Sequence, residues 1–185
     1  MDDEETINQA IVRSDDINMV VEKALNRDID TLAALRIAFL REDHYDLTDH
    51  DADVIFQELP EYFDVHLNQD LFCYVVRDGE TIVSCAYLLV VEKPMNPAFL
   101  NGKTGIVMNV YTRPAFRRRG YAGRIIETLL EDAKRMDLCT VELKATDAGY
   151  PLYWAAGFVD DISDYHPMRW NNHSVSSTLC CSRKN

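Results

Sequence analysis

A cluster of arginines interrupts an otherwise acidic chain. Five arginines lie in the segment Arg113–Arg124, whereas the whole chain has a formal net charge of -12. Small residues stand among them at 120, 122 and 123, and a helical pattern of apolar residues starts at the same point. The first amide groups of a helix have no partner within the helix, and small residues let a ligand reach the main chain. The segment therefore predicts a binding site for phosphate groups at a helix N-terminus, in preference to an exposed arginine-rich turn.

Two motifs carry a resemblance to a known family. The spacing of Arg117, Gly120 and Ala122 resembles the Q/R-x-x-G-x-G/A signature of the GNAT superfamily of N-acetyltransferases. Further along, Thr146–Phe158 is similar, apart from its first residue, to that family's closing N-x-x-x-x-x-L-Y-x-x-x-G-F segment. The resemblance covers roughly residues 17 to 170. It implies an α/β fold with a mixed, largely antiparallel central sheet flanked by helices, in which two central strands splay apart.

The resemblance also implies a co-substrate, acetyl-coenzyme A. In the family, the strand before the arginine cluster binds the pantetheine arm and the thioester carbonyl through its main chain, and the following amides bind the pyrophosphate. Thr146 stands where the family often has an asparagine that contacts the cofactor, and its hydroxyl can donate or accept instead. The residues expected to bind the cofactor are Val110, Thr112, Arg117, Arg118, Arg119, Gly120, Tyr121, Ala122, Gly123, Arg124 and Thr146.

Acetyl transfer to an amine needs a base for the amine and a proton for the departing thiolate. Tyr153 occupies the tyrosine position of the second motif, and a phenol with a pKa near 10 stays protonated at neutral pH, so we expect it to be the general acid. The alternative is that Tyr153 only packs beside its aromatic neighbours. No motif fixes the base, and Glu58 and Glu61 are the candidates proposed from a tract without Lys or Arg.

That acidic tract runs from Glu42 to Asp64 and contains nine acids. In the family this region forms one wall of the acceptor pocket, and Asp160, Asp161 and Asp164 follow the second motif near the opposite wall. Two acidic walls predict a small-molecule or peptide acceptor with a cationic amine. The competing interpretation is an acidic surface that only serves solubility. The sequence leaves the identity of the acceptor open.

Composition and patterning indicate one cytoplasmic domain. Residues 1–16 read as an acidic lead, 17–170 as the acetyltransferase domain and 171–185 as a polar tail. No signal segment or membrane span is expected, and neither the cysteines nor the histidines have metal-ligand spacing. The acidic balance argues against nucleic-acid binding. Dimerisation is common among similar proteins, and the sequence leaves it open.

The chain pattern predicts a series of elements that would position these residues. Strands are expected at 17–25, 71–77, 81–91, 103–112 and 139–145, the last of them buried, with a final strand or hairpin at 158–170. Asp78-Gly79 indicates a hairpin turn. Helices are expected from Asp28, over 51–67 with a break or kink at Pro60, from Gly120 to Met136, and over 148–156.

The leading functional hypothesis is an N-acetyltransferase in which the amine attacks acetyl-CoA directly in a ternary complex. The alternative is a non-catalytic acyl-CoA-binding or regulatory module of the same fold. A nucleotide-using transferase or kinase is disfavoured, because the chain has no G-x-x-x-x-G-K-[ST] segment.

Overall fold

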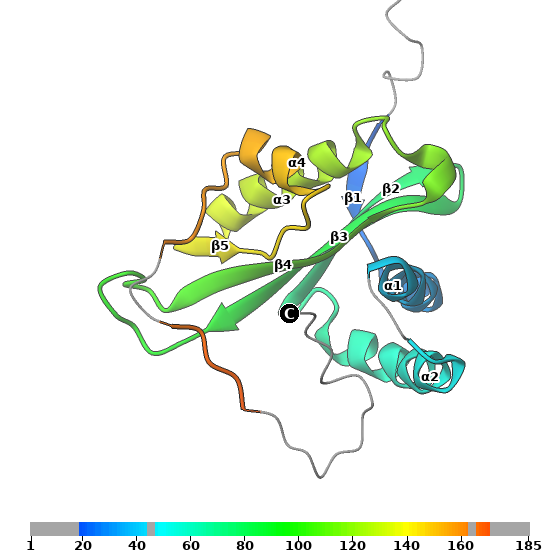
Figure 1. The fold of residues 1–185 in the computed structure, drawn as a ribbon, viewed down its shortest axis with the longest axis horizontal. Helices are drawn as coiled ribbons and strands as arrows, with labels where there is room; N and C mark the ends of the chain where they lie inside the picture. The colour runs from blue at the N-terminus through cyan, green and yellow to red at the C-terminus, as the bar shows by residue number, and fades with distance from the viewer. Residues whose placement is uncertain (1–18, 44–46, 163–165, 171–185) are drawn as a thin grey trace, which may run out of the picture.

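The structure is a computed structural model that describes residues 19–43, 47–162 and 166–170. A five-stranded sheet separates two pairs of helices, as Figure 1 shows. The strands are β1 (Val21–Lys23), β2 (Leu71–Asp78), β3 (Thr81–Glu92), β4 (Lys103–Thr112) and β5 (Thr140–Glu142). The α-helices are α1 (Ile29–Asp43), α2 (Asp49–His66), α3 (Tyr121–Arg135) and α4 (Tyr150–Ala155), and short 3-10 helices are η2 (Asn26–Asp28) and η3 (Pro114–Phe116).

The sheet follows the order of the chain, β1-β2-β3-β4-β5. The first four strands are antiparallel to their neighbours, and β5 alone runs parallel to β4, with α3 as the connection between them. The predicted mixed, largely antiparallel sheet is therefore confirmed. β4 and β5 pair only over Thr104–Ile106 and Thr140–Glu142, so that the second half of β4 has no strand on that side among the described residues.

Each face of the sheet has its own hydrophobic core. On one face α1 and α2 bury residues such as Leu32, Leu35 and Phe63 against the alternate side chains of β2 and β3. On the other face α3 buries Ile125, Ile126 and Leu129, as the helical spacing of its apolar residues predicts. Figure 1 shows α4 beside α3 on this second face. The sheet thus forms a rigid middle layer from which β4 presents groups to both sides.

Several elements lie where the sequence predicts them. β2 and β3 form the expected hairpin, in which Asp78 pairs with Thr81 and Gly79 takes the left-handed conformation that such a turn requires, with φ +57°. The predicted bounds of β4, Lys103–Thr112, agree with the structure. α3 begins one residue after Gly120, which is its N-cap.

Three predicted elements are wrong in part. β5 has three residues instead of seven and is not buried, because, of its side chains, only that of Val141 packs against the core under α3. Residues 158–162 and 166–170 contain no strand, and their side chains Ile162, Met168 and Trp170 are almost fully exposed, since no sheet edge lies against them. β1 is shorter than predicted, and residues 17 and 18 lie outside the described range.

Pro60 does not end α2, which is one helix from Asp49 to His66. A proline within a helix removes one main-chain hydrogen bond. Here Phe63, one turn later, is 1% exposed and packs in the core between α1, α2 and the sheet. This burial keeps the second half of α2 on the sheet despite the missing bond.

β4 contains an irregularity that the sequence does not reveal. Cys85 of β3 pairs with Tyr111, but Tyr87 pairs with Met108, so β4 has one more residue than β3 across this step. The extra residue is accommodated at Asn109, whose φ of +52° is in the left-handed region. This is a β-bulge, which disrupts the ladder locally and bends the strand.

Candidate functional site

The start of α3 has the main-chain conformation of an anion-binding site. Gly120, the N-cap residue, has a φ of +82° and its residue type offers no side-chain cap, so the first amide groups of the helix are left for another partner. Arg118 also has a positive φ, +63°, which makes the approach to the helix a tight turn. A Cβ atom on Gly120 or Gly123 would meet no protein atom within 4 Å. The space over this turn is open to a ligand.

The arginine side chains of the cluster divide into two kinds. Arg113 and Arg117 are held by the sheet: Arg113 Nε donates to the Ile82 carbonyl at 2.8 Å, and Arg117 Nε donates to the Thr112 carbonyl at 2.9 Å. Arg118, Arg119 and Arg124 are exposed. Arg119 donates to the Ala115 carbonyl at 3.2 Å, and Arg124 lies 3.4 Å from Glu127 on α3. Arg117 is exposed as well, so four of the five arginines are on the surface, and Arg118, Arg119 and Arg124 are the three that the sheet does not hold.

β4 leads into this turn along an edge that no described strand covers. Its residues from Val107 to Thr112 lie beyond the part that pairs with β5. Val110 packs towards α3, and the Thr112 hydroxyl bonds to that of Ser84 at 2.7 Å. No described strand pairs with the main chain of β4 on this side, and the predicted cofactor contacts of Val110 and Thr112 remain a prediction. The Thr112 carbonyl already accepts from Arg117.

α4 places Tyr153 beside the same region. Its ring packs in the core on the α3 face and makes an edge-to-face contact with Phe158, at 6.0 Å between ring centroids. No described group forms a hydrogen bond with its hydroxyl, and every buried polar side-chain atom among the described residues has a partner, so this hydroxyl is accessible. Burial of the ring, together with the negative charge of Asp43, raises the pKa of Tyr153. The phenol keeps its proton well into the alkaline range.

The last turn of α1 approaches the site from the opposite face of the sheet. Glu42 accepts a hydrogen bond from the Tyr111 hydroxyl at 3.0 Å and forms an ion pair with Arg117. Asp43 follows it, and its charge acts on both Tyr153 and Arg36. Burial and the bond to Glu42 raise the pKa of Tyr111. Two carboxylates of the acidic tract thus lie near the C-terminal end of β4.

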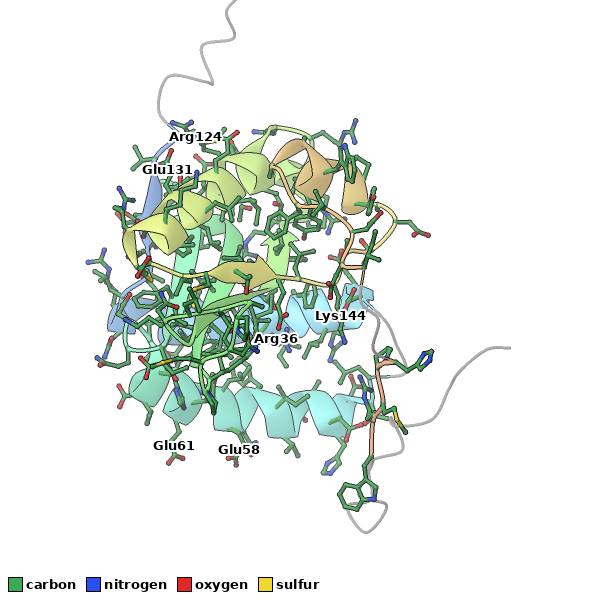
Figure 2. All side chains as sticks on the ribbon, turned by 90° about the vertical axis from the view of Figure 1, so that its left-hand side faces the viewer. Arg36, Glu58, Glu61, Arg124, Glu131 and Lys144 are labelled. Carbon is green, nitrogen blue, oxygen red and sulfur yellow. The ribbon has the colours of Figure 1, made fainter. Side chains whose placement is uncertain are left out.

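A chain of polar contacts joins α1 to the bulge in β4. Arg36 Nη1 donates to Asn109 Oδ1 at 3.2 Å, and Asn109 Nδ2 lies 3.6 Å from Cys85 Sγ. Burial raises the pKa of the Cys85 thiol to about 12, so the sulfur is a neutral thiol. Burial also lowers the pKa of Arg36. Figure 2 shows Arg36 between the layers, whereas Arg124 and Glu131 lie on the outer side of α3.

Comparison with known proteins agrees with this geometry. The model of the Acetyltransferase (GNAT) family matches residues 32–158, which include the last turns of α1, all of β4, the helix start and Tyr153. The chain belongs to the GNAT acetyltransferase family. The expected co-substrate, acetyl-CoA, is thereby confirmed at the level of the family. No curated protein matches the sequence significantly.

Solved structures show the same GNAT fold. A predicted acetyltransferase from Clostridium acetobutylicum, solved with acetyl-CoA, is 25% identical with a TM-score of 0.70, over 82% of this chain and 96% of that one. A GCN5-related N-acetyltransferase from Ralstonia eutropha JMP134 is 23% identical with a TM-score of 0.66, over 82% and 99%. Glucosamine-6-phosphate N-acetyltransferase from Arabidopsis thaliana is 18% identical with a TM-score of 0.55, over 82% and 98%.

The other predicted site residues of this GNAT protein lie in different places. Glu58 and Glu61 are exposed, and Figure 2 shows them projecting from α2 on the side away from the sheet. Thr146 forms the turn into α4, where its hydroxyl accepts from the Gly149 amide at 3.2 Å and its carbonyl from the Tyr150 amide at 2.9 Å. Tyr121, Ala122 and Gly123 form the first turn of α3.

The acids of the two predicted walls have different surroundings. Asp49 is paired with Arg41 at 2.9 Å, and Asp160 accepts from the Tyr150 hydroxyl at 3.1 Å. Asp161 is exposed, whereas Asp46 and Asp164 lie outside the described residues. No group of three or more His, Cys, Asp or Glu side chains within the described ranges could hold a metal ion. In the same ranges, no helix is long and apolar enough to cross a membrane.

Sequence reasoning did not point to Arg36, assigned no role to Asn109 and counted Asp43 only as one of the nine acids of the tract. Arg36 and Asp43 are seven residues apart, or about two helical turns, so they share one side of α1. That spacing was a usable signal for a shared face. The strand register that brings Asn109 to Arg36 depends on the bulge, for which the sequence gives no signal.

We expect Gly120→Val to abolish acetyl-CoA binding, because it places a branched side chain over the open turn and strains a residue with φ +82°. Gly79→Val is the matched control, since Gly79 also has a positive φ and open space around its Cβ position, but lies in the hairpin turn. Calorimetric titration with acetyl-CoA compares the two. Equal binding by both variants would place the phosphate site elsewhere.

Proposed function

We propose that this protein transfers the acetyl group of acetyl-CoA to the primary amine of a cationic acceptor, by direct attack in a ternary complex. The observation that carries the proposal is the combination on one side of β4 of an uncovered strand edge, an uncapped and open helix start, and the accessible hydroxyl of Tyr153. The strand edge suits the pantetheine arm, and the helix start suits the pyrophosphate. In this proposal the hydroxyl supplies the proton that the departing thiolate needs.

The bound donor is acetyl-CoA, and the protein's residues act around it. The amides from Arg118 to Arg124 bind the pyrophosphate, and exposed guanidinium groups of Arg118, Arg119 and Arg124 add positive charge. Thr112 and Val110 bind the pantetheine and thioester through the main chain. Arg117 contributes through its ion pair with Glu42, which ties the turn before α3 to the end of α1.

Tyr153 acts as the general acid. Attack of the neutral amine on the thioester carbon forms a C–N bond, and cleavage of the C–S bond leaves a thiolate that takes the phenolic proton. A pKa raised by burial suits this role, because the phenol remains protonated throughout the neutral range. The accessible hydroxyl supports an enzyme over a module that only binds acyl-CoA.

We place the general base at Asp43 instead of Glu58 or Glu61. Asp43 is close enough to Tyr153 for its charge to act on the phenol, and it ends α1 next to Glu42. Glu42 is held in place by its ion pair with Arg117 and by the hydrogen bond from the Tyr111 hydroxyl. Asp43 removes the amine proton directly or through a water molecule.

Tyr153→Phe should lower kcat about 10² to 10⁴-fold while acetyl-CoA affinity and the melting temperature stay unchanged, because only the hydroxyl is removed. In the wild type, kcat should fall only above about pH 10, since the pKa of the phenol lies above its ordinary value and the acid is lost when it ionises. The variant should lack this alkaline limb. An unchanged kcat with a confirmed acceptor would exclude Tyr153 from the chemistry.

Asp43→Asn should lower kcat about 10² to 10⁴-fold, because it removes the base but keeps the size of the side chain. The double variant Glu58→Gln, Glu61→Gln is the control and should retain wild-type kcat, since both side chains face away from the sheet. Steady-state kinetics under identical conditions compares them. If kcat falls strongly in the double variant and not in Asp43→Asn, the general base is on α2 and not at Asp43.

A screen of amines by release of free CoA should identify cationic acceptors, and higher salt should raise their KM more than that of acetyl-CoA. The Debye length, beyond which exposed charges are largely screened, shrinks from about 10 Å at 0.1 M salt to about 3 Å at 1 M. The support is the acidic tract, in which Asp51, Asp53 and Asp64 are partly or fully exposed. If only neutral or anionic amines react, the charge argument is wrong.

A further inference from the structure

The bulge in β4 changes which side chains face each core. Met108 and Tyr111 belong to the core under α1 and α2, whereas Val107 and Val110 belong to the core under α3. A regular strand alternates with a period of two. Here the side chains on each face are three residues apart, and Asn109 is the residue that makes the difference. Without the bulge, the side chains of Val110 and Tyr111 would lie on opposite faces from those they occupy now. Tyr111 would then lose its hydrogen bond to Glu42.

Asn109 is held by side-chain contacts in a conformation that most residues avoid. It is 3% exposed, and its φ of +52° is tolerated by asparagine better than by most other residues. Its amide group bonds in two directions, to Arg36 on α1 and to Cys85 on β3. The Cys85 thiol also points at the Asn109 carbonyl, at 3.9 Å. These contacts fix both the side chain and the main chain of the bulge.

α1 is fixed against the sheet along the side that bears Arg36. The Tyr87 hydroxyl donates to the Leu32 carbonyl at 3.2 Å, one turn before Arg36. Glu42 accepts from Tyr111 near the other end of the helix. The Arg36 guanidinium also lies 5.6 Å from the centre of the Phe39 ring, which limits its movement. The arginine therefore reaches the bulge from a helix that is held at both ends.

We propose that Arg36 and Asn109 are positioning residues that set the orientation of the β4 main chain at Val110 for the thioester of acetyl-CoA. The inference rests on the proposed function, in which that main chain binds the thioester. The side chains act through the bulge: Arg36 holds the Asn109 amide, Asn109 holds the left-handed turn, and the turn directs the groups that follow it along the uncovered edge. Neither side chain needs to touch acetyl-CoA.

A double-mutant cycle in Arg36→Met and Asn109→Gly tests this proposal. Glycine adopts positive φ freely, so Asn109→Gly removes the amide contacts without straining the turn. Each single variant should lower kcat about 10- to 100-fold, since a small misplacement of reacting groups has effects of this size. Because both act through one contact, the double variant should be no slower than the slower single variant.

The reaction to follow is thiol release from acetyl-CoA, with the best amine from the screen or, if none reacts, with water. Arg41→Met is the matched control and should keep wild-type kcat, because Arg41 is on the same helix but is exposed and pairs with Asp49 among the described residues. Arg36→Lys can still donate to the Asn109 oxygen and should recover part of kcat. If a thermal melt shows that Arg36→Met does not fold, Arg36→Lys takes its place in the cycle.

Three outcomes would overturn the proposal: unchanged kcat in the folded single variants, losses that multiply in the double variant, or an effect confined to the KM of the amine. The last would make Arg36 a residue that contacts the acceptor. Failure of the proposed function is separate, because a wild-type chain that does not bind acetyl-CoA in the calorimeter would fail before any variant is compared.

Discussion

β4 has to pair with two strands at one end and with only one at the other, and the rest of the site depends on this constraint. At the shared end the strands are packed closely: a Cβ atom on Gly105 would lie 2.8 Å from Leu88 Cδ1 and 3.0 Å from Leu138 Cδ1. Beyond Ile106 the partner strand ends, and the main chain of β4 is left uncovered on that side by the described residues. The close contact and the open edge are consecutive parts of one strand. The uncovered main chain is thus continuous with a closely packed part of the sheet.

The arginines of the cluster differ in their contacts, which the sequence alone does not distinguish. Arg117 lies beside Glu42 with both side chains a little over 40% exposed, so this ion pair contributes little to stability, about 0 to 1 kcal/mol. Its value lies in geometry, because it joins the turn before α3 to the end of α1 across the edge of the sheet. Arg118, Arg119 and Arg124 are exposed, and the proposed function assigns to them the positive charge at the helix start.

Local signals in the sequence predicted much of the fold. The Asp78-Gly79 turn, the apolar run of β4 and the helical period after Gly120 each depend on neighbouring residues, and each is confirmed. The predictions are wrong where contacts between residues far apart in the sequence determine the structure. α2 continues through Pro60 because Phe63 is buried, and the residues after Phe158 do not form a strand because no described edge lies beside them. The motifs located the helix start and Tyr153, whereas Asp43 and the Arg36–Asn109 contact arise only when α1 lies against β4.

The two outer strands of the sheet have a consequence for the behaviour of the protein at high concentration. A long, flat outer strand exposes a row of main-chain donors and acceptors that can recruit another chain and start aggregation. In this sheet both outer strands, β1 and β5, have only three residues, and each ends in a charged residue, Lys23 and Glu142. So short a row gives an incoming strand few bonds to form. Of the long strands, β3 is paired along both edges, whereas β1 and β5 cover β2 and β4 only at Tyr74–Val76 and Thr104–Ile106. The protection against strand addition therefore applies to the two outer strands and to β3.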